Sequence, residues 1–192
     1  MRIAIIQGHP DPAGNRYGHA LANAYVQGAK SAGHSVELID IARLDFPLLR
    51  TQDEWSSASA PAALEDAQKA IAAAEHIVIF FPLWLGTLPA LLKAFLEQVL
   101  RPGFAIEKSD GAGMWTKRLK GKSARIVVTM GMPAPIYRWF FRAHAIKGLE
   151  RNILRFCGIA PIAESLIGSV EGKPAHRKKW LERMERLGAQ GR

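Results

Sequence analysis

Short apolar segments alternate with longer helical ones along this sequence, and that alternation restricts the fold more than any other feature. Five segments have the length and residue types of strands: Ile3–Ile6, Ser35–Asp40, Ile77–Phe81, Ala124–Met130 and Ile162–Ile167. The segments that follow them have helical periodicity or helical propensity: 17–32, 64–74, 88–100, 146–156 and 174–187. Five strands interleaved with five helices predict a doubly wound α/β sheet.

The length and composition favour one folded domain over residues 1–192, because 48% of the 192 residues are hydrophobic and 22% are charged. The single cysteine, Cys157, excludes an internal disulfide and is expected to be a buried apolar residue. We predict no metal, since the histidines show no ligand spacing. The N-terminal apolar run is too short for an export signal, and 77–92 is too short and too rich in proline to span a bilayer. The sequence therefore predicts a cytoplasmic protein.

The charge of the chain is unevenly distributed. Residues 1–100 hold 7 basic and 10 acidic side chains, whereas residues 101–192 hold 19 basic and 7 acidic ones, within a net charge of +9. Such a field favours anionic partners without choosing among them. Nucleic acid is not predicted, because no recognised binding motif accompanies the charge.

Ligands of doubly wound sheets bind beyond the carboxyl ends of the strands, which directs attention to residues 8–17, 82–88 and 130–137. The first of these loops lacks the glycine patterns of dinucleotide-binding and P-loop proteins. It nevertheless opens a helix, and a helix start binds anions. Asn15, Arg16 and Tyr17 would then add hydrogen bonds and charge, unless Asn15 only caps the helix and Arg16 is only solvated.

The second loop is apolar, and the third loop contains candidate proton donors. Trp84 stands among proline, leucine and glycine residues, which favours packing on a flat apolar ligand, or else a place in the core or in a dimer interface. Gly131 permits a close approach of backbone to ligand. Tyr137 and His144 are candidate proton donors, with a purely structural role as the alternative.

Several longer motifs resemble the NAD(P)H:quinone oxidoreductase family. The resemblance rests on GHPDP after the first strand, FPLWLGTLPALLKAFLEQVLRPGFA after the third, VVTMGMPAPIY at the fourth, and ILRFCGI beyond it. It covers nearly the whole chain. It implies a flavodoxin-like fold, with a five-stranded parallel sheet in the order 2-1-3-4-5 and helices on both faces. It also implies a flavin bound without a covalent bond, in a homodimer whose second subunit completes the active site.

The same resemblance implies roles for particular residues. The flavin phosphate region would be held by His9, Asn15, Arg16 and Tyr17. The flavin ring would be lined by Pro82, Leu83, Trp84 and Leu85, and its pyrimidine end by Thr129, Met130, Gly131 and Met132. Tyr137 and His144 look like the tyrosine and histidine that assist proton movement. This chain departs from the family pattern in a first loop about two residues longer, in Met132 where the family often has glycine, and in the seven-residue spacing from Tyr137 to His144.

The implied reaction is hydride transfer from NAD(P)H to the flavin, and then from the flavin to a quinone or similar acceptor in the same pocket. The cofactor we expect is FMN, with FAD as the alternative, because no segment is evident that would hold an adenosine. Two other readings share the fold: a flavodoxin-like electron carrier, which the basic charge disfavours, and a regulatory subunit of a membrane transporter.

Overall fold

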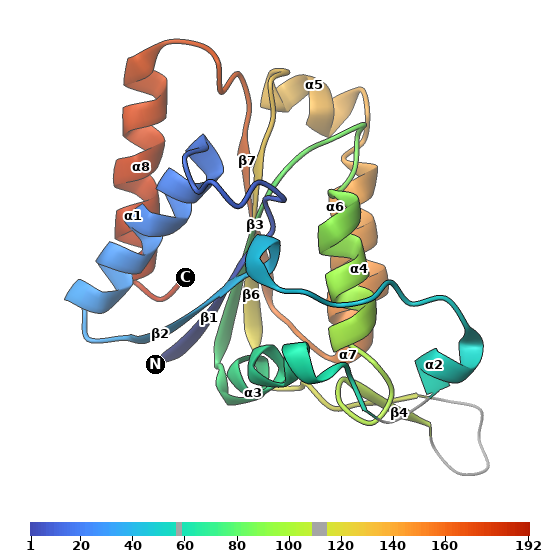
Figure 1. Cartoon of the computed structure of the whole chain (residues 1–192). Helices are drawn as coiled ribbons and strands as arrows, with labels where there is room; N and C mark the ends of the chain where they lie inside the picture. The colour runs from blue at the N-terminus through green and yellow to red at the C-terminus, as the bar shows by residue number, and fades with distance from the viewer. Residues whose placement is uncertain (57–58, 109–114) are drawn as a thin grey trace.

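The computed structural model describes residues 1–56, 59–108 and 115–192 and contains the predicted parallel sheet (Figure 1). Its strands lie in the order β2-β1-β3-β6-β7, and all neighbouring pairs are parallel. Their bounds are β1 Arg2–Gln7, β2 Ser35–Asp40, β3 His76–Pro82, β6 Ser123–Thr129 and β7 Ile162–Ile167. The predicted fold class and strand order are confirmed, because β6 and β7 are the fourth and fifth strands of this sheet.

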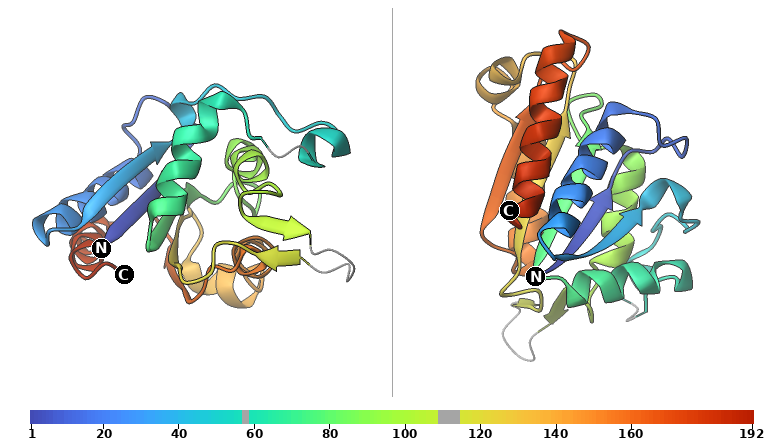
Figure 2. Two further views of the ribbon diagram at one scale, coloured as in Figure 1. Left: turned by 90° about the horizontal axis from the view of Figure 1, so that it is seen from below. Right: turned by 90° about the vertical axis from the view of Figure 1, so that its left-hand side faces the viewer.

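Helices cover both faces of the sheet, as predicted (Figure 2). One face carries α1 (Tyr17–Ser31) and α8 (Pro174–Ala189); the other carries α3 (Glu65–Ala73), α4 (Ala90–Val99), α6 (His144–Gly148) and α7 (Arg155–Cys157). A π-helical turn, Leu149–Leu154, joins α6 to α7. Side chains alternate between the two cores along β1: Ile3 and Ile5 face the α1–α8 side, and Ala4 and Ile6 face the other.

Several short elements were not predicted. They are the helices α2 (Gln52–Ser56) and α5 (Ala134–Trp139), the antiparallel strands β4 (Ile106–Lys108) and β5 (Trp115–Lys117), and two 3-10 turns, Ile41–Arg43 and Ala62–Leu64. Each spans six residues or fewer, which is too short for a hydrophobic periodicity to be detected in the sequence. Within residues 1–56, 59–108 and 115–192, no helix is both long and apolar enough to cross a lipid bilayer.

His76 gives the fold a specific sensitivity to acid. It is buried on β3, its Nδ1 lies 2.8 Å from Ser123 Oγ, and burial lowers its pKa from 6.5 to about 4, with a further contribution from the Arg125 charge. The unfolded chain therefore takes up a proton at this histidine before the folded chain does. The resulting loss of stability begins as the pH falls below 6.5 and reaches about 2 to 3 kcal/mol near pH 4.5.

We expect His76→Asn to remove most of this dependence, because an amide can still bond Ser123 but does not titrate. The measurement is urea unfolding of both proteins at pH 7.5 and pH 4.5. Between these pH values the free energy of unfolding of the parent should fall by about 2 to 3 kcal/mol more than that of the variant. Equal losses in the two proteins would show that other groups govern acid unfolding.

Candidate functional site

The three loops singled out in the sequence meet at one edge of the sheet, at the top of the molecule in Figure 1. The Gly8 N–H donates to the Phe80 carbonyl at 2.7 Å, so the first loop runs directly against the end of β3. The Leu83 N–H donates to the Thr129 carbonyl at 2.8 Å, which joins the second loop to the end of β6. The backbone therefore brings these loops together at one edge of the sheet, as the sequence predicted.

Side chains hold the first loop in one conformation. The His9 N–H donates to Gln7 Oε1 at 3.1 Å, the Asp11 N–H donates to His9 Nδ1 at 3.0 Å, and the Ala13 N–H donates to Asp11 Oδ1 at 2.9 Å. Because Nδ1 of His9 accepts, its proton in the neutral form sits on Nε2. Burial lowers the pKa of His9, and the neighbouring His19 lowers it further. His9 is thus a neutral hydrogen-bond donor near pH 7.

A second histidine, His19, completes this part of the site. It is 7% exposed, its Nδ1 accepts from the Arg16 N–H at 3.3 Å, and its ring centre lies 5.0 Å from that of His9. Its Nε2 is buried and has no partner among the described residues. The first turn of α1 also carries no acidic side chain; its His19 N–H donates to the Arg16 carbonyl at 3.0 Å, while the amides that precede it have no i−4 carbonyl within the helix. Two ring N–H groups and the start of α1 could together hold an anion, and we call this group the anion site.

Sequence reasoning considered His19 only as a metal ligand and missed this position. The signal was present: His19 stands three residues after Arg16, where a side chain reaches back to the amide that precedes a helix.

The predicted phosphate residues Asn15, Arg16 and Tyr17 lie at the same helix start, but their side chains have other contacts. Asn15 is exposed, and the Arg16 guanidinium bonds Asp11 with Nε at 2.6 Å from Oδ2. The Tyr17 hydroxyl donates to the Arg177 carbonyl of α8 at 2.9 Å, and burial raises its pKa to about 12. The backbone of Arg16 and Tyr17 is near the anion site, whereas the Tyr17 hydroxyl ties two helices together.

The second loop forms a tight hairpin from Trp84 to Thr87, closed by two backbone hydrogen bonds of 3.0 Å. Leu85 and Gly86 at its tip have φ values of 48° and 80°, the left-handed conformation for which asparagine and glycine are the usual choice. Leu85 is strained there and is also fully exposed, at 105%. A leucine is unfavourable both in a left-handed backbone conformation and in full contact with water. Its presence here indicates contact with a ligand or a partner.

Trp84, the first residue of this hairpin, is half exposed, and its ring lies edge-on to His9 at 5.8 Å. This contact places the apolar hairpin directly beside the anion site. Pro82 and Leu83, which precede it, are partly buried at the end of β3.

The hairpin and the third loop enclose a cavity of about 370 Å³. Its lining is Leu85, Gly86, Met132, Tyr137, Phe141 and His144. This volume lies in the range of small-molecule sites. The structure therefore brings Leu85 and Met132 together with both candidate proton donors, from segments about 50 residues apart.

The other predicted residues of the third loop differ in burial and therefore in how easily a ligand could contact them. Thr129 and Met130 are buried; the Thr129 carbonyl accepts from Leu83, and the Met130 side chain belongs to the core. Gly131 is exposed at the turn. A ligand at this edge would meet the backbone of Gly131 and the side chain of Met132 more readily than the side chain of Met130.

Tyr137 has a buried hydroxyl with no partner in good hydrogen-bonding geometry among the described residues. Burial raises its pKa by more than the nearby amides of Ala145 and Ile146 lower it. Tyr137 therefore remains protonated, and the residue lines the cavity. His144 is exposed on the cavity rim at the first residue of α6.

These features fit a planar ring that carries a phosphate. The buried Nε2 of His19 and the buried hydroxyl of Tyr137 are polar atoms without partners in the described residues, and such atoms are uncommon in folded proteins. One lies in the anion site and the other lies beside the cavity. The apolar hairpin of Trp84 and Leu85 stands between the two and offers a surface for a ring.

A second, apolar groove of about 260 Å³ lies on another face and contains none of the predicted site residues. It is lined by Leu49, Trp55, Lys93, Leu96, Glu97, Leu100, Ile106, Asn152, Ile153, Phe156 and Cys157. The two charged groups of this groove, Lys93 and Glu97, bond each other. The Cys157 thiol is buried, which raises its pKa to about 12. Among the described residues that line it, the groove therefore offers no available acid, base or nucleophile, and it is less suited to chemistry than the cavity at Tyr137.

Comparisons with known proteins identify relatives of this architecture. A family model described as flavodoxin-like fold matches residues 1–189. An uncharacterized NAD(P)H oxidoreductase of Haemophilus influenzae is 28% identical over 174 residues, which cover 88% of this chain and 85% of the relative. The family resemblance expected from the sequence is confirmed.

Two solved structures share the fold. NAD(P)H:quinone oxidoreductase from Methanothermobacter marburgensis superposes with a TM-score of 0.86 at 21% identity, covering 100% of this chain and 99% of the other. An FMN-dependent NADH-azoreductase from Bacillus anthracis, in complex with FMN, superposes with a TM-score of 0.75 at 14% identity, covering 98% and 97%.

Proposed function

Because this chain belongs to the flavodoxin-like fold family, we propose that it is a flavin-dependent NAD(P)H oxidoreductase that reduces quinones or similar acceptors. The observation that carries the proposal is the cavity of about 370 Å³ beside Tyr137 and His144, at the sheet edge that also holds the anion site. Relatives described as an NAD(P)H oxidoreductase and an FMN-dependent NADH-azoreductase support it. FMN is the cofactor we propose, since its one phosphate matches the anion site at the start of α1.

Bound FMN would supply the redox chemistry by accepting a hydride from NAD(P)H and releasing it to an acceptor. His9, His19 and the amides at the start of α1 would hold its phosphate. Trp84 and Leu85 would pack on the ring, with Gly131 and Met132 at its far end. Tyr137, protonated and buried, would donate a hydrogen bond where negative charge develops, and His144 on the rim would exchange protons with water.

The order of events we propose is a ping-pong one through the cavity of about 370 Å³ beside Tyr137. The nicotinamide and the acceptor would occupy it in turn. We also propose that the protein is a cytoplasmic homodimer. Its apolar groove with Trp55 and Phe156 would be covered by the second copy, which would leave the edge with α5 free.

The experiment is an absorption spectrum of the purified protein after incubation with FMN and desalting, followed by additions of NADH or NADPH without oxygen. We expect retained flavin that bleaches with a pyridine nucleotide and recovers with a quinone. Retained flavin that neither nucleotide reduces would instead indicate an electron carrier or a regulatory subunit. Loss of both FMN and FAD on desalting would contradict the site assignment.

His19→Leu should weaken FMN binding about tenfold and leave riboflavin binding within twofold, because only FMN carries the phosphate that His19 Nε2 would contact. The measurement is quenching of flavin fluorescence during titration of the protein without cofactor. His34→Leu is the control, since His34 lies beside Met1 at the other end of the sheet. Equal weakening of FMN and riboflavin would assign His19 a purely structural role.

A further inference from the structure

The edge of the molecule that holds the cavity also exposes a group of large apolar side chains, and the proposed reaction has no role for three of them, Ile136, Trp139 and Phe140. We define the α5 patch as Ile136, Trp139, Phe140, Phe141 and Leu85. Trp139 is 75% exposed and Phe140 is 79% exposed. Apolar side chains that cluster in this way on a surface usually mark a contact with another molecule or with lipid.

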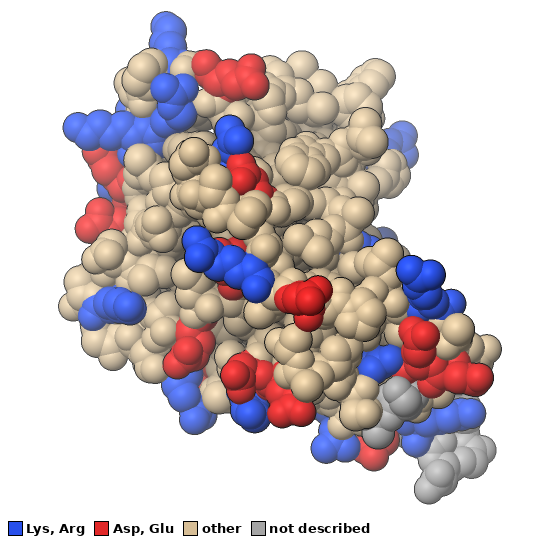
Figure 3. Space-filling model, viewed as in Figure 1, with Lys and Arg blue, Asp and Glu red and all other residues tan. Residues whose placement is uncertain are grey.

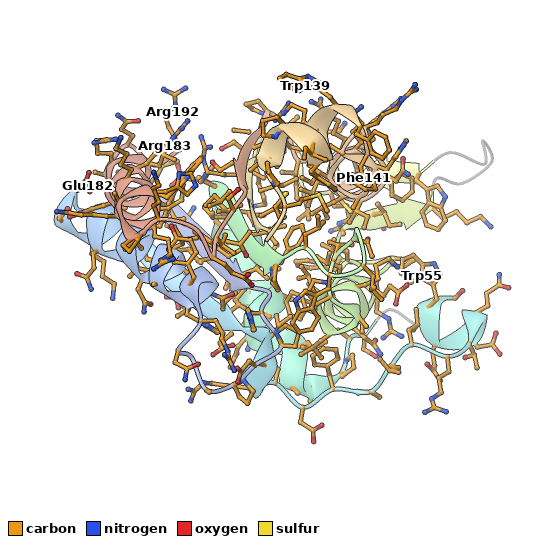
Figure 4. All side chains as sticks on the ribbon, turned by 90° about the horizontal axis from the view of Figure 1, so that it is seen from above. Trp55, Trp139, Phe141, Glu182, Arg183 and Arg192 are labelled. Carbon is orange, nitrogen blue, oxygen red and sulfur yellow. The ribbon has the colours of Figure 1, made fainter. Side chains whose placement is uncertain are left out.

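The patch is continuous with the proposed substrate cavity. Phe141 and Leu85 line that cavity, and the rings of Phe140 and Phe141 lie 5.0 Å apart in an edge-to-face arrangement. Figure 4 shows Trp139 at the outer margin of α5, pointing away from the molecule, while Phe141 lies closer to its body. An apolar path therefore runs from the outermost tip of α5 into the cavity mouth.

Basic residues lie at the same end of the molecule as the patch. Arg138 and Arg142 flank the aromatic run in the sequence and are exposed, although the Arg138 guanidinium is paired with Glu164 at 2.9 Å, and Lys173 and Lys178 are exposed at the start of α8. The loop before α8 is fastened to the third loop by a 3.1 Å hydrogen bond from the Ser169 N–H to the Met132 carbonyl, and Figures 1 and 2 show α5 and the start of α8 at the same end of the molecule. In Figure 3 the surface near α5 is mostly uncharged, with Lys and Arg side chains, and on the α8 side also acidic ones, at its margins.

We propose that the α5 patch docks this protein on an anionic lipid bilayer. Tryptophan and phenylalanine side chains enter the interfacial layer of a membrane, and each nearby Lys or Arg adds attraction to anionic headgroups. A second copy is a poor occupant, because Arg142 and Lys173 would then face the same cations on a molecule of net charge +9.

Docking of this kind gives the proposed reaction a source of substrate, and this extension rests on the proposed function. Quinones with long apolar tails dissolve in bilayers and not in water. A cavity that opens through Phe141 and Leu85 toward the lipid would receive such a ring without exposing its tail to water. The acceptor class we infer is therefore a membrane-dissolved quinone.

The test of docking is co-sedimentation of the full chain, with and without FMN, on vesicles of phosphatidylcholine alone or with phosphatidylglycerol. We expect at least tenfold stronger binding to the anionic vesicles and weaker binding as salt is added. The double variant Trp139→Ser/Phe140→Ser should bind the anionic vesicles at least tenfold more weakly than the parent. The matched control, Leu38→Ser/Leu48→Ser, removes two exposed leucines elsewhere and should bind as the parent does.

The test of quinone delivery compares a water-soluble quinone with a long-chain quinone embedded in anionic vesicles. The patch variant should lose rate only with the embedded quinone. Vesicle binding by a protein that retains no flavin would uphold docking while the proposed function fails. Normal flavin reduction without vesicle binding would overturn docking. If the patch variant instead changed the sedimentation of the free protein, the patch would be an interface between copies and the proposal would be wrong.

Discussion

Tyr137→Phe is expected to lower the rate of quinone reduction about 100-fold while FMN and nucleotide still bind. The tyrosine hydroxyl is the buried donor beside the cavity, and a positioned proton donor typically contributes a factor of 10² to 10⁴. The ring is retained, so the lining of the cavity hardly changes. Stopped-flow reduction and reoxidation of the bound flavin, followed by absorbance, separates the two half-reactions and measures this loss.

The same variant has a second expected result in stability. Because the Tyr137 hydroxyl is buried without a good partner, its removal should leave the free energy of unfolding unchanged or slightly raised. Burial also raises the pKa of Tyr137, so the parent rate should show no loss from this group between pH 6 and pH 9. A hydroxyl that is unfavourable for the fold and needed for turnover is the combination expected of a functional group.

Tyr25→Phe is the matched control. Tyr25 is also fully buried with an unpartnered hydroxyl, but it lies in the core between α1, α8 and the sheet. We expect no change in either half-reaction. A similar loss of rate in both variants, or less than a threefold loss in Tyr137→Phe, would contradict the catalytic assignment of Tyr137.

Gly188→Ala is expected to destabilise the fold by about 3 kcal/mol or more. A Cβ at Gly188 would lie 2.1 Å from the Tyr25 carbonyl oxygen, and one at Gly28 would lie 1.8 Å from the Glu185 carbonyl oxygen. The backbones of α1 and α8 therefore touch at two glycines, and the atoms in the way belong to backbone that cannot rotate aside. Alanine would force the helices apart. Urea unfolding measures the change in the free energy of unfolding, with one common dependence on urea concentration fitted to both proteins.

Gly148→Ala is the control for this substitution. Gly148 is also a helical glycine, and no atom lies within 4 Å of a Cβ placed on it. Alanine there should raise the free energy of unfolding by about 0.5 to 1 kcal/mol, because it restricts the unfolded chain and favours the helix. If Gly188→Ala were as well tolerated, the close contact of α1 and α8 would not be required for stability.

The same contact explains one difference between sequence and structure in the site. Tyr17 was predicted to hold a phosphate, yet its hydroxyl bonds the Arg177 carbonyl of α8. That partner is 160 residues away, and its proximity depends on the close packing of the two helices at Gly28 and Gly188. Nothing in the local sequence distinguishes a tyrosine that faces a ligand from one that faces a distant helix.

The strands of the sheet could be predicted from the sequence. Apolar runs such as Ile3–Ile6 and Ile77–Phe81 are buried on both faces, so their character does not depend on which partner lies beside them. The helices that follow them are nine residues or longer in α1, α3, α4 and α8, which is enough for periodicity to appear. The six residues of α5, preceded by Pro133 and containing Pro135, offered no such pattern.

By itself, the sequence therefore determined the alternation of strands and helices and the edge at which three loops would meet, because these follow from periodicity and from the geometry of parallel sheets, whereas the strand order followed from the family resemblance. Only the tertiary structure decided which side chains share that edge. The pairing of His9 with His19, the position of Leu85 opposite Tyr137 and His144, and the outward orientation of Trp139 all depend on contacts between segments whose separation in the sequence carries no directional information. Side-chain direction is set by packing across the whole core, and a local pattern does not encode it.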